Sequence, residues 1–170
     1  MKLLIHINHP AHVHLFRNLI KILRDKGHKV LITCIKKDIT LQLLKEHNLD
    51  FTLVGEHKSK VIGKAANLLQ ISNEIYQICV KERPEILIGL ASIPIAIVGK
   101  LLGIKSLILD DTDHSTSEIF LYKYLADSII TPDCFNINLG EKHHKYSSYH
   151  EFAYLHPSNF TPDSAIIDEL

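Results

Sequence analysis

The sequence has no tryptophan, one methionine and only three cysteines. The cysteines, Cys34, Cys79 and Cys134, are widely spaced and form no CxxC pair. This spacing argues against a disulfide framework and against a zinc knuckle. We therefore expect a protein of the reducing cytoplasm.

Long apolar runs are also missing from the sequence. No uninterrupted run reaches the roughly 18 residues that a membrane-spanning helix needs. The apolar start at residues 1–7 is followed at once by Asn8, His9 and Pro10, too soon for the apolar core of a signal peptide. These two absences predict a soluble protein with no transmembrane segment.

Neither sign of charge predominates, since 19 Lys and Arg residues balance 19 Asp and Glu residues. Nothing in this balance calls for a polyanionic partner, so nucleic acid is disfavoured. A chain of 170 residues, 46% of them hydrophobic, is long enough to bury the core of one domain. Histidine, by contrast, is abundant, with twelve copies.

Short apolar runs alternate with helical patterns along the first part of the chain. Buried strands are predicted at residues 2–7, 28–33, 50–54, 86–90, 105–109 and 128–131. Helices are predicted between them at residues 15–23, 39–47, 61–79, 95–102 and 118–126. Continuously apolar strands separated by helices are typical of βαβ units, whose parallel sheet is covered on both faces. The predicted fold class is α/β, a doubly wound parallel sheet forming a Rossmann-like domain over residues 1–133.

The pattern weakens beyond Pro132. Residues 134–170 are predicted to be a last loop or hinge region, in which His143 and His144 belong to a solvated stretch. Residues 163–170 resemble the first turns of a helix that lacks the length and the core that a helix normally needs. A second domain is therefore expected to follow.

The loop after the first predicted strand carries Asn8, His9, His12 and His14. In an open parallel sheet, ligands bind beyond the carboxyl ends of the strands. The loop lacks the glycines of a GxGxxG fingerprint, so a dinucleotide site is not expected. An imidazole, with an ordinary pKa of about 6.5, could act here as a general base toward a sugar hydroxyl. The alternative is that these histidines cap the following helix or face water.

Acidic residues gather directly after the fifth predicted strand, where Asp110, Asp111, Asp113 and His114 lie within five positions. Such a concentration of like charge is costly unless a ligand, a cation or a positive partner relieves it. Alternatively, Asp113 or Ser115 simply caps the next helix. No tight ligand spacing such as HExxH is present, so no metal site is predicted.

A third cluster comprises Tyr149, His150 and Glu151, followed by Tyr154 and His156. Aromatic faces with polar tips suit sugar rings. The same residues could equally form an ordered hinge that packs against a second domain.

Three segments carry a resemblance to a known family: NHPAHVH at residues 8–14, DDTDH at residues 110–114, and the stretch from Tyr149 to Pro157. They resemble the proteins catalogued as domain of unknown function 354. That family looks like a branch of the GT-B superfamily, alongside the glycosyltransferase that makes lipid II and the non-hydrolysing 2-epimerase of UDP-N-acetylglucosamine. The resemblance covers essentially the whole chain, but it matches only the amino-terminal half of the family.

The resemblance implies a cleft between two Rossmann-like domains, with the acceptor held mostly by the first and the nucleotide-sugar by the second. The chain would then be the acceptor-side half of a glycosyltransferase of surface glycan or polysaccharide synthesis, inactive by itself. Its substrate would be a nucleotide-sugar such as a UDP-sugar, with no bound cofactor. Its partner would be a carboxyl-terminal domain or a separately encoded half.

In this mechanism His9, His12 or His14 takes the proton of the acceptor hydroxyl, and Asp110 or Asp111 orients the imidazole. Substrate contacts are expected from Asn8, Asp113, His114, Tyr149, His150 and Glu151.

Two other functions stay open. One is a 2-epimerase or related sugar-nucleotide isomerase, although the Gly-Asp-Thr run of that family is replaced here by Gly89, Leu90, Ala91 and Ser92. The other is a non-catalytic sugar-binding or assembly subunit.

Overall fold

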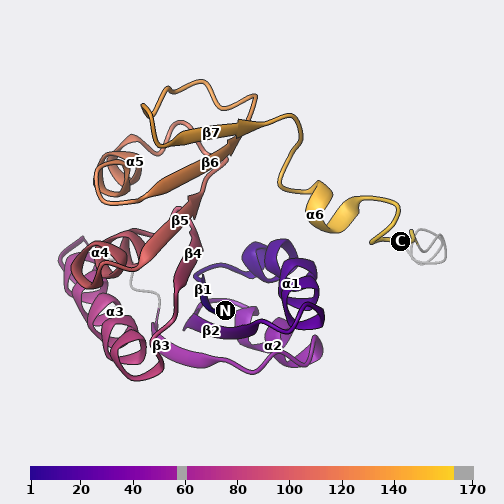
Figure 1. The fold of residues 1–170 in the computed structure, drawn as a ribbon, viewed down its shortest axis with the longest axis horizontal. Coiled ribbons are helices and arrows are strands. Elements are labelled where there is room, and N and C mark those ends of the chain that lie inside the picture. The colour runs from indigo at the N-terminus through magenta and orange to yellow at the C-terminus, as the bar shows by residue number, and fades with distance from the viewer. Residues whose placement is uncertain (57–60, 163–170) are drawn as a thin grey trace.

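The computed structural model describes residues 1–56 and 61–162. It shows one sheet of seven strands, all parallel, in the order β3-β2-β1-β4-β5-β6-β7 (Figure 1). The strands are β1 (Lys2–Ile7), β2 (Lys29–Lys36), β3 (Thr52–Glu56), β4 (Ile86–Leu90), β5 (Lys105–Leu109), β6 (Ser128–Pro132) and β7 (His143–Tyr146). The predicted fold class, a doubly wound Rossmann-like α/β domain, is confirmed.

Helices cover both faces of the sheet (Figure 1). One face carries α1 (Pro10–Asp25), α2 (Thr40–Glu46) and the short α6 (Phe152–Leu155). The other face carries α3 (Val61–Glu82), α4 (Ile93–Leu102) and α5 (Thr116–Lys123). Because every connection between neighbouring parallel strands must cross over a face, the alternating sequence pattern leads to this two-sided cover.

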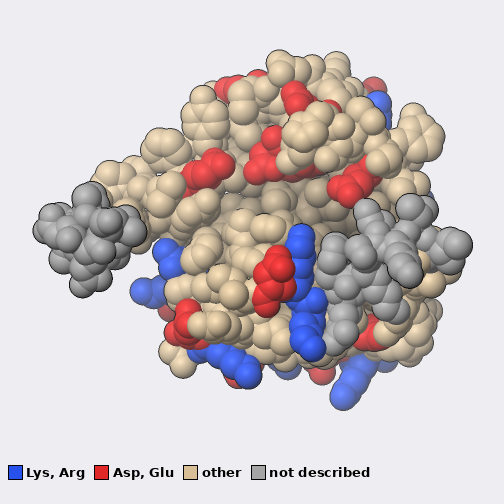
Figure 2. Space-filling model, turned by 180° about the vertical axis from the view of Figure 1, so that it is seen from behind, with Lys and Arg blue, Asp and Glu red and all other residues tan. Residues whose placement is uncertain are grey.

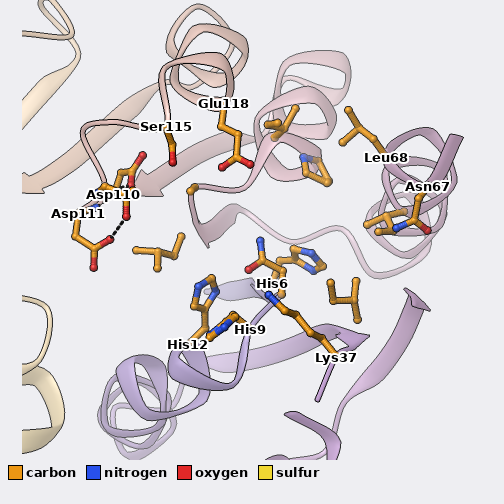
Figure 3. Close-up of a pocket in the computed structure, with 18 residues that line it drawn as sticks. His6, His9, His12, Lys37, Asn67, Leu68, Asp110, Asp111, Ser115 and Glu118 are labelled. Atoms are coloured by element: carbon orange, nitrogen blue, oxygen red, sulfur yellow. Dashed lines mark hydrogen bonds between the residues drawn. The ribbon is translucent and has the colours of Figure 1, made fainter. Parts of the chain in front are cut away.

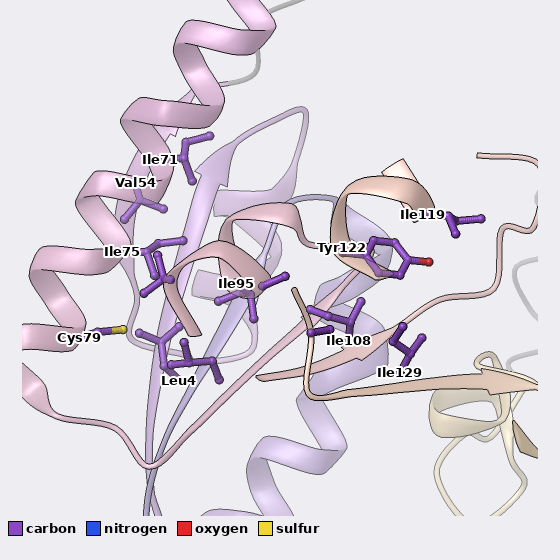
Figure 4. Close-up of a cluster of buried hydrophobic side chains, with 14 of the residues drawn as sticks. Leu4, Val54, Ile71, Ile75, Cys79, Ile95, Ile108, Ile119, Tyr122 and Ile129 are labelled. Atoms are coloured by element: carbon purple, nitrogen blue, oxygen red, sulfur yellow. The ribbon is translucent and has the colours of Figure 1, made fainter. Parts of the chain in front are cut away.

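Strand β1 shows why the central strands are continuously apolar. Leu3 and Ile5 belong to the core cluster under α1, whereas Leu4 belongs to the cluster under α3 and α4. The second cluster joins Ile75 of α3, Ile95 of α4 and Ile108 of β5 (Figure 4). Side chains of a strand alternate between faces, so both sets must be apolar when both faces are covered.

The chain reverses direction across the sheet between β1 and β4. From β1 it proceeds outward to β2 and β3, and then returns to place β4 on the other side of β1, with His6 opposite Gly89. The connections that leave β1 and β4 therefore diverge to opposite faces. This topological switch point is where an open α/β sheet leaves a crevice beyond the carboxyl ends of its strands.

Strand β7 was not predicted, because His143 and His144 were expected to lie in a solvated loop. The strand pairs with β6, and the His143 ring lies with Nε2 2.7 Å from Thr131 Oγ1 and accepts a hydrogen bond from Leu139 N through Nδ1 at 3.2 Å. As an edge strand of four mostly polar residues, it lacks the apolar run of a central strand. The sheet thus extends past the domain boundary expected at residue 133, whereas the helix expected at residues 163–170 lies outside the described residues.

Within residues 1–56 and 61–162, no helix is both long and apolar enough to cross a membrane.

Gly99 sets the distance between α4 and the sheet. A Cβ atom at this position would lie 2.8 Å from Ser106 Cβ and 2.9 Å from the carbonyl oxygen of Ile104. The second contact is with backbone, which cannot rotate away. Glycine therefore allows α4 to pack closely on β5, and this packing places the amino-terminal end of α4 beside the switch point.

We expect Gly99→Ala to destabilise the protein by about 1–3 kcal/mol, the usual cost of overpacking. Helix propensity alone predicts the opposite sign, since alanine is favoured over glycine by about 1 kcal/mol inside a helix. The measurement is urea unfolding, with Lys100→Ala on the exposed side of the same helix as the control, for which we expect a change within about 0.5 kcal/mol. A stabilised Gly99→Ala protein would contradict this role of the glycine.

Candidate functional site

A pocket of about 400 Å³ lies at the switch point, beyond the carboxyl ends of β1, β2, β4 and β5 (Figure 3). We call it the switch pocket. Its lining includes apolar residues of β2, α3 and α4 and a larger set of polar side chains. The polar ones are His6, Asn8, His9, His12, Lys37, Asn67, Asp110, Asp111, Thr112, Ser115 and Glu118.

His9 sits at the start of α1, where the strand ends and the helix begins. Its Nδ1 accepts a hydrogen bond from the Ala11 backbone N–H at 3.2 Å, so the ring caps the helix. Burial and the nearby Lys37 lower its pKa. A neutral ring that accepts through Nδ1 carries its proton on Nε2. His9 thus offers a ligand a hydrogen-bond donor.

His12 lies in the first turn of α1 and is only 7% exposed. Its Nδ1 is buried without a hydrogen-bond partner. Burial, together with the neighbouring His9 and His6 rings and Lys37, lowers its pKa to about 3. The imidazole is therefore neutral at physiological pH and has an unsatisfied nitrogen, which a ligand could pair.

His14 takes no part in the switch pocket. Its ring lies 6.0 Å from that of His47 and 5.7 Å from that of Tyr154, measured between centroids. Of the three loop histidines named from the sequence, the structure brings His9 and His12 to the pocket and directs His14 toward α2 and α6.

Two basic side chains of the pocket were missed from the sequence. His6 is the fifth residue of β1, with Nδ1 3.1 Å from Thr33 Oγ1, and burial lowers its pKa to about 4. Lys37 directly follows β2. A histidine near the carboxyl end of an otherwise apolar strand was the available signal for His6. Lys37 could be assigned to the pocket only by knowing that β2 lies beside β1.

Asp110, on the opposite side of the pocket, is 1% exposed and organises the loop after β5. One carboxylate oxygen accepts hydrogen bonds from the backbone N–H groups of Asp111 and Thr112, at 2.8 and 2.9 Å. The other oxygen accepts a bond from the Tyr122 hydroxyl. Burial raises the Asp110 pKa, whereas these three hydrogen bonds act to lower it. Its hydrogen bonds hold the loop in place, and none of them comes from a histidine.

Asp111 and Glu118 are the exposed carboxylates of the switch pocket. Asp111 accepts a bond from the Thr112 hydroxyl at 3.0 Å, which leaves its other oxygen for a ligand. Figure 3 shows this acidic side of the pocket facing the side that carries His6, His9, His12 and Lys37. Figure 2 shows the wider surface, with acidic side chains gathered above the hollow and both basic and acidic ones below it.

Asp113 and His114 do not line the switch pocket. Asp113 accepts a hydrogen bond from the Asn136 side chain at 3.0 Å, and His114 is exposed. Ser115 precedes α5, but its side chain makes no capping bond. The acidic run thus divides into two parts, with Asp110 and Asp111 inside the pocket and Asp113 and His114 outside it.

The third predicted cluster lies elsewhere. Tyr149 and His150 line a separate pocket of about 300 Å³ between α1 and residues 146–153. Glu151 is exposed and precedes α6. The two pockets share no lining residue.

The switch pocket suits a ligand rich in hydroxyl groups. It combines neutral imidazoles, two asparagine amides and exposed carboxylates, and these groups can donate hydrogen bonds to hydroxyls or accept them. Helices α1 and α4 begin beside it, and neither has an acidic residue in its first turn to oppose the positive end of its dipole. In the part of the chain that the structure describes, no group of three or more histidine, cysteine and acidic side chains could hold a metal ion.

Solved structures with the same fold are numerous but distant in sequence. MurG of Acinetobacter baumannii is 13% identical, with a TM-score of 0.69 over 85% of this chain and 45% of that one. A UDP-GlcNAc 2-epimerase of Neisseria meningitidis bound to UDP-GlcNAc is 11% identical, with a TM-score of 0.70 over 91% of this chain and 48% of that one. The spinosyn rhamnosyltransferase SpnG, complexed with thymidine diphosphate, is 16% identical, with a TM-score of 0.59 over 78% of this chain and 45% of that one.

These likenesses establish the fold as that of a Rossmann-like domain of GT-B proteins. The chain spans about half the length of each of these structures. Among curated proteins, none matches this chain in sequence. A family model matches residues 1–151, and the chain therefore belongs to the family described as "Protein of unknown function (DUF354)".

Proposed function

We propose that this chain forms the acceptor-side half of a GT-B glycosyltransferase. The enzyme transfers a sugar from a nucleotide-sugar, such as a UDP-sugar, to a hydroxyl held in the switch pocket, in the synthesis of a surface glycan or polysaccharide. The second half, supplied by further sequence or by a separately encoded partner, carries most of the nucleotide contacts. The nucleotide-sugar enters as a substrate, and the proposal includes no resident cofactor.

The observation that carries this proposal is that the two sides of the switch pocket differ in their hydrogen-bonding groups. Neutral imidazoles and a helix amino terminus lie on one side, and exposed carboxylates lie on the other. Sugar hydroxyls both donate and accept, so they can satisfy both walls at once. The rhamnosyltransferase SpnG and the glycosyltransferase VinC, which are among the similar structures, support the same class of reaction.

His12 is the residue to which we assign the acceptor's proton. It lines the pocket, and its Nδ1 is buried without a partner. A pKa of about 3 makes it a weak base in the free chain. The negative charge of a bound diphosphate would raise that pKa, because an opposite charge nearby favours the protonated ring. The ring would therefore become an effective base when the donor binds.

The other pocket residues bind and orient. His9 donates through Nε2, Asn8 lies beside it, and Asp111 accepts from a sugar hydroxyl. Asp110 is a positioning residue that keeps the loop in shape through Tyr122. The substrate contacts predicted for Asp113, His114 and Glu151, and a catalytic role of His14, have no support from the geometry of this pocket and stay predictions.

A 2-epimerase is the second candidate, because several similar structures are UDP-GlcNAc 2-epimerases with TM-scores of 0.64–0.70. Against it, the turn after β4 offers Ala91 and Ser92 where a carboxylate is expected, and the Ser92 side chain is buried without a partner.

The choice between the two reactions can be read from solvent exchange. With the complementary half supplied, UDP-GlcNAc incubated in D₂O should gain no deuterium at the carbon next to the anomeric centre. Mass spectrometry of the recovered sugar gives the answer. Deuterium at that carbon would assign the epimerase reaction and overturn the transferase proposal.

Binding by the chain itself tests the pocket. We expect His12→Asn to weaken the binding of methyl N-acetyl-β-glucosaminide about fivefold to tenfold, since one hydrogen bond contributes about 1 kcal/mol. His14→Asn is the matched control: the same substitution two residues away, outside the pocket, should leave the affinity within twofold. Titration calorimetry measures both, at matched protein stability. Equal losses in the two variants, or no binding by the unsubstituted chain, would argue against this pocket as the acceptor site.

The neutral state of the buried rings predicts a pH dependence of stability. Burial lowers the pKa of His6 in the folded chain from 6.5 to about 4, so protons bind the unfolded chain more tightly. The stability linked to His6 is therefore complete above pH 6.5 and is lost as the pH falls to 4, by roughly 3 kcal/mol. His12 adds a loss of the same sign over a range that reaches lower pH.

Urea unfolding between pH 7.5 and 4 measures this loss, and His6→Asn should make the curve shallower. Should that variant fail to fold, NMR titration of the histidine rings decides instead. The His6 and His12 resonances should not titrate between pH 5.5 and 8. A midpoint near 6.5 for either ring would show that it is not held neutral by burial.

A further inference from the structure

The second pocket, between α1 and residues 146–153, differs in chemistry from the switch pocket. Its volume is about 300 Å³, at the lower end of the range for small-molecule sites. Most of its wall is apolar, provided by Leu15, Phe16, Leu19, Leu109, Phe152 and Ala153. We call it the apolar pocket.

Among the polar residues of this wall, His150 has a ring nitrogen that is buried without a hydrogen-bond partner. His150 is 6% exposed and lines the pocket, and its Nε2 is buried without a hydrogen-bond partner. The other ring nitrogen, Nδ1, lies 2.7 Å from the Tyr146 hydroxyl. Burial lowers the His150 pKa, so the ring is neutral. Depending on the tautomer, Nε2 can donate a hydrogen bond to a ligand oxygen or accept one from a ligand hydroxyl. An unpaired buried nitrogen is costly, and a ligand oxygen would remove that cost.

The roof of the apolar pocket is fixed to the body of the domain. The Asn18 side chain donates a hydrogen bond to the Ala153 carbonyl at 2.7 Å. The Tyr154 ring packs against His14 of α1. At the mouth, Tyr149 and Phe152 are stacked with centroids 6.5 Å apart, and each is about half exposed. The cavity is thus held open by contacts that do not fill it.

The two pockets lie on opposite sides of one layer of side chains. Phe16 lines the apolar pocket and meets the His12 ring edge-on, with centroids 6.5 Å apart. Leu109 lines the apolar pocket, and the next residue, Asp110, lines the switch pocket. The His150 ring is close enough to Asp110 and Asp111 to feel their charge. A molecule lying over this layer of side chains would reach both pockets.

We propose that the apolar pocket binds an alkyl or aryl group of the acceptor, with one acceptor oxygen paired to His150 Nε2. This inference rests on the proposed function for the identity of the ligand as an acceptor, and it adds that the acceptor is amphipathic. The sugar part lies in the switch pocket and the apolar part beyond the wall of His12 and Phe16. Burial of the apolar group provides affinity, while the single polar contact fixes its depth.

The test compares octyl and methyl N-acetyl-β-glucosaminide, which share the sugar and differ in the apolar group. The unsubstituted chain should bind the octyl glycoside at least tenfold more tightly. Ser148→Phe, which introduces a large side chain into the apolar pocket, should abolish that advantage and leave the methyl glycoside unaffected. Ser147→Phe is the matched control: the neighbouring exposed serine does not line the pocket, and the octyl advantage should persist.

A second measurement does not depend on any variant folding. On NMR titration, the His150 ring resonances should shift with the octyl glycoside and not with the methyl glycoside. Equal affinities of the two glycosides for the unsubstituted chain, or an octyl advantage that survives Ser148→Phe, would overturn the proposal. Equal affinities are also the result expected if the pocket is instead covered by a protein segment.

The two proposals fail in different ways. If the switch pocket is not a sugar site, the methyl glycoside does not bind and His12→Asn has no effect on the octyl glycoside, while Ser148→Phe still weakens it. If the apolar pocket is not a ligand site, His12→Asn weakens both glycosides equally and Ser148→Phe weakens neither.

Discussion

The cover on both faces of the sheet is the constraint on which the rest of this structure depends. Because β1 is buried by α1 on one side and by α3 and α4 on the other, its outgoing connection must turn to one face and that of β4 to the opposite face. Open α/β sheets bind ligands in the crevice between two such diverging connections. The switch pocket is therefore a consequence of the topology, and Gly99 contributes by allowing α4 to lie close to the sheet beside it.

Burial at this edge gives the polar side chains their chemistry. His6 and His12 lie where the apolar core ends, so both rings lose hydration and are held neutral. Asp110 lies at the same depth, but three hydrogen bonds fix its carboxylate. Asp111, one residue further, is exposed. A change of one position thus separates a residue that shapes the loop from one that faces a ligand.

The periodicity of the sequence was sufficient to predict the fold class and six of the strands, because continuously apolar runs are typical of strands buried on both faces. It missed β7, since an edge strand of four mostly polar residues carries no such signal. The sequence pattern also predicted that the polar loops lie at one edge of the sheet. It could not tell which residues of each loop line the pocket. His14 is two positions from His12 on a helix, and whether a side chain faces the pocket or α2 depends on helix phase and tertiary packing. His6 was predicted only as part of the buried strand at residues 2–7, and in the structure it also lines the pocket.

The separation of the two pockets follows from the same layer of residues. Helix α1 presents His12 toward the switch pocket and Leu15, Phe16 and Leu19 toward the apolar pocket. Strand β5 does likewise at its end, with Leu109 on one side and Asp110 on the other. Alternation at the end of the strand directs Leu109 and Asp110 to opposite sides. On α1 the four residues follow one stripe of the helix, whose amino-terminal end meets the switch pocket and whose later turns meet the apolar pocket. A ligand with a polar and an apolar part matches this arrangement, since neither pocket alone suits both.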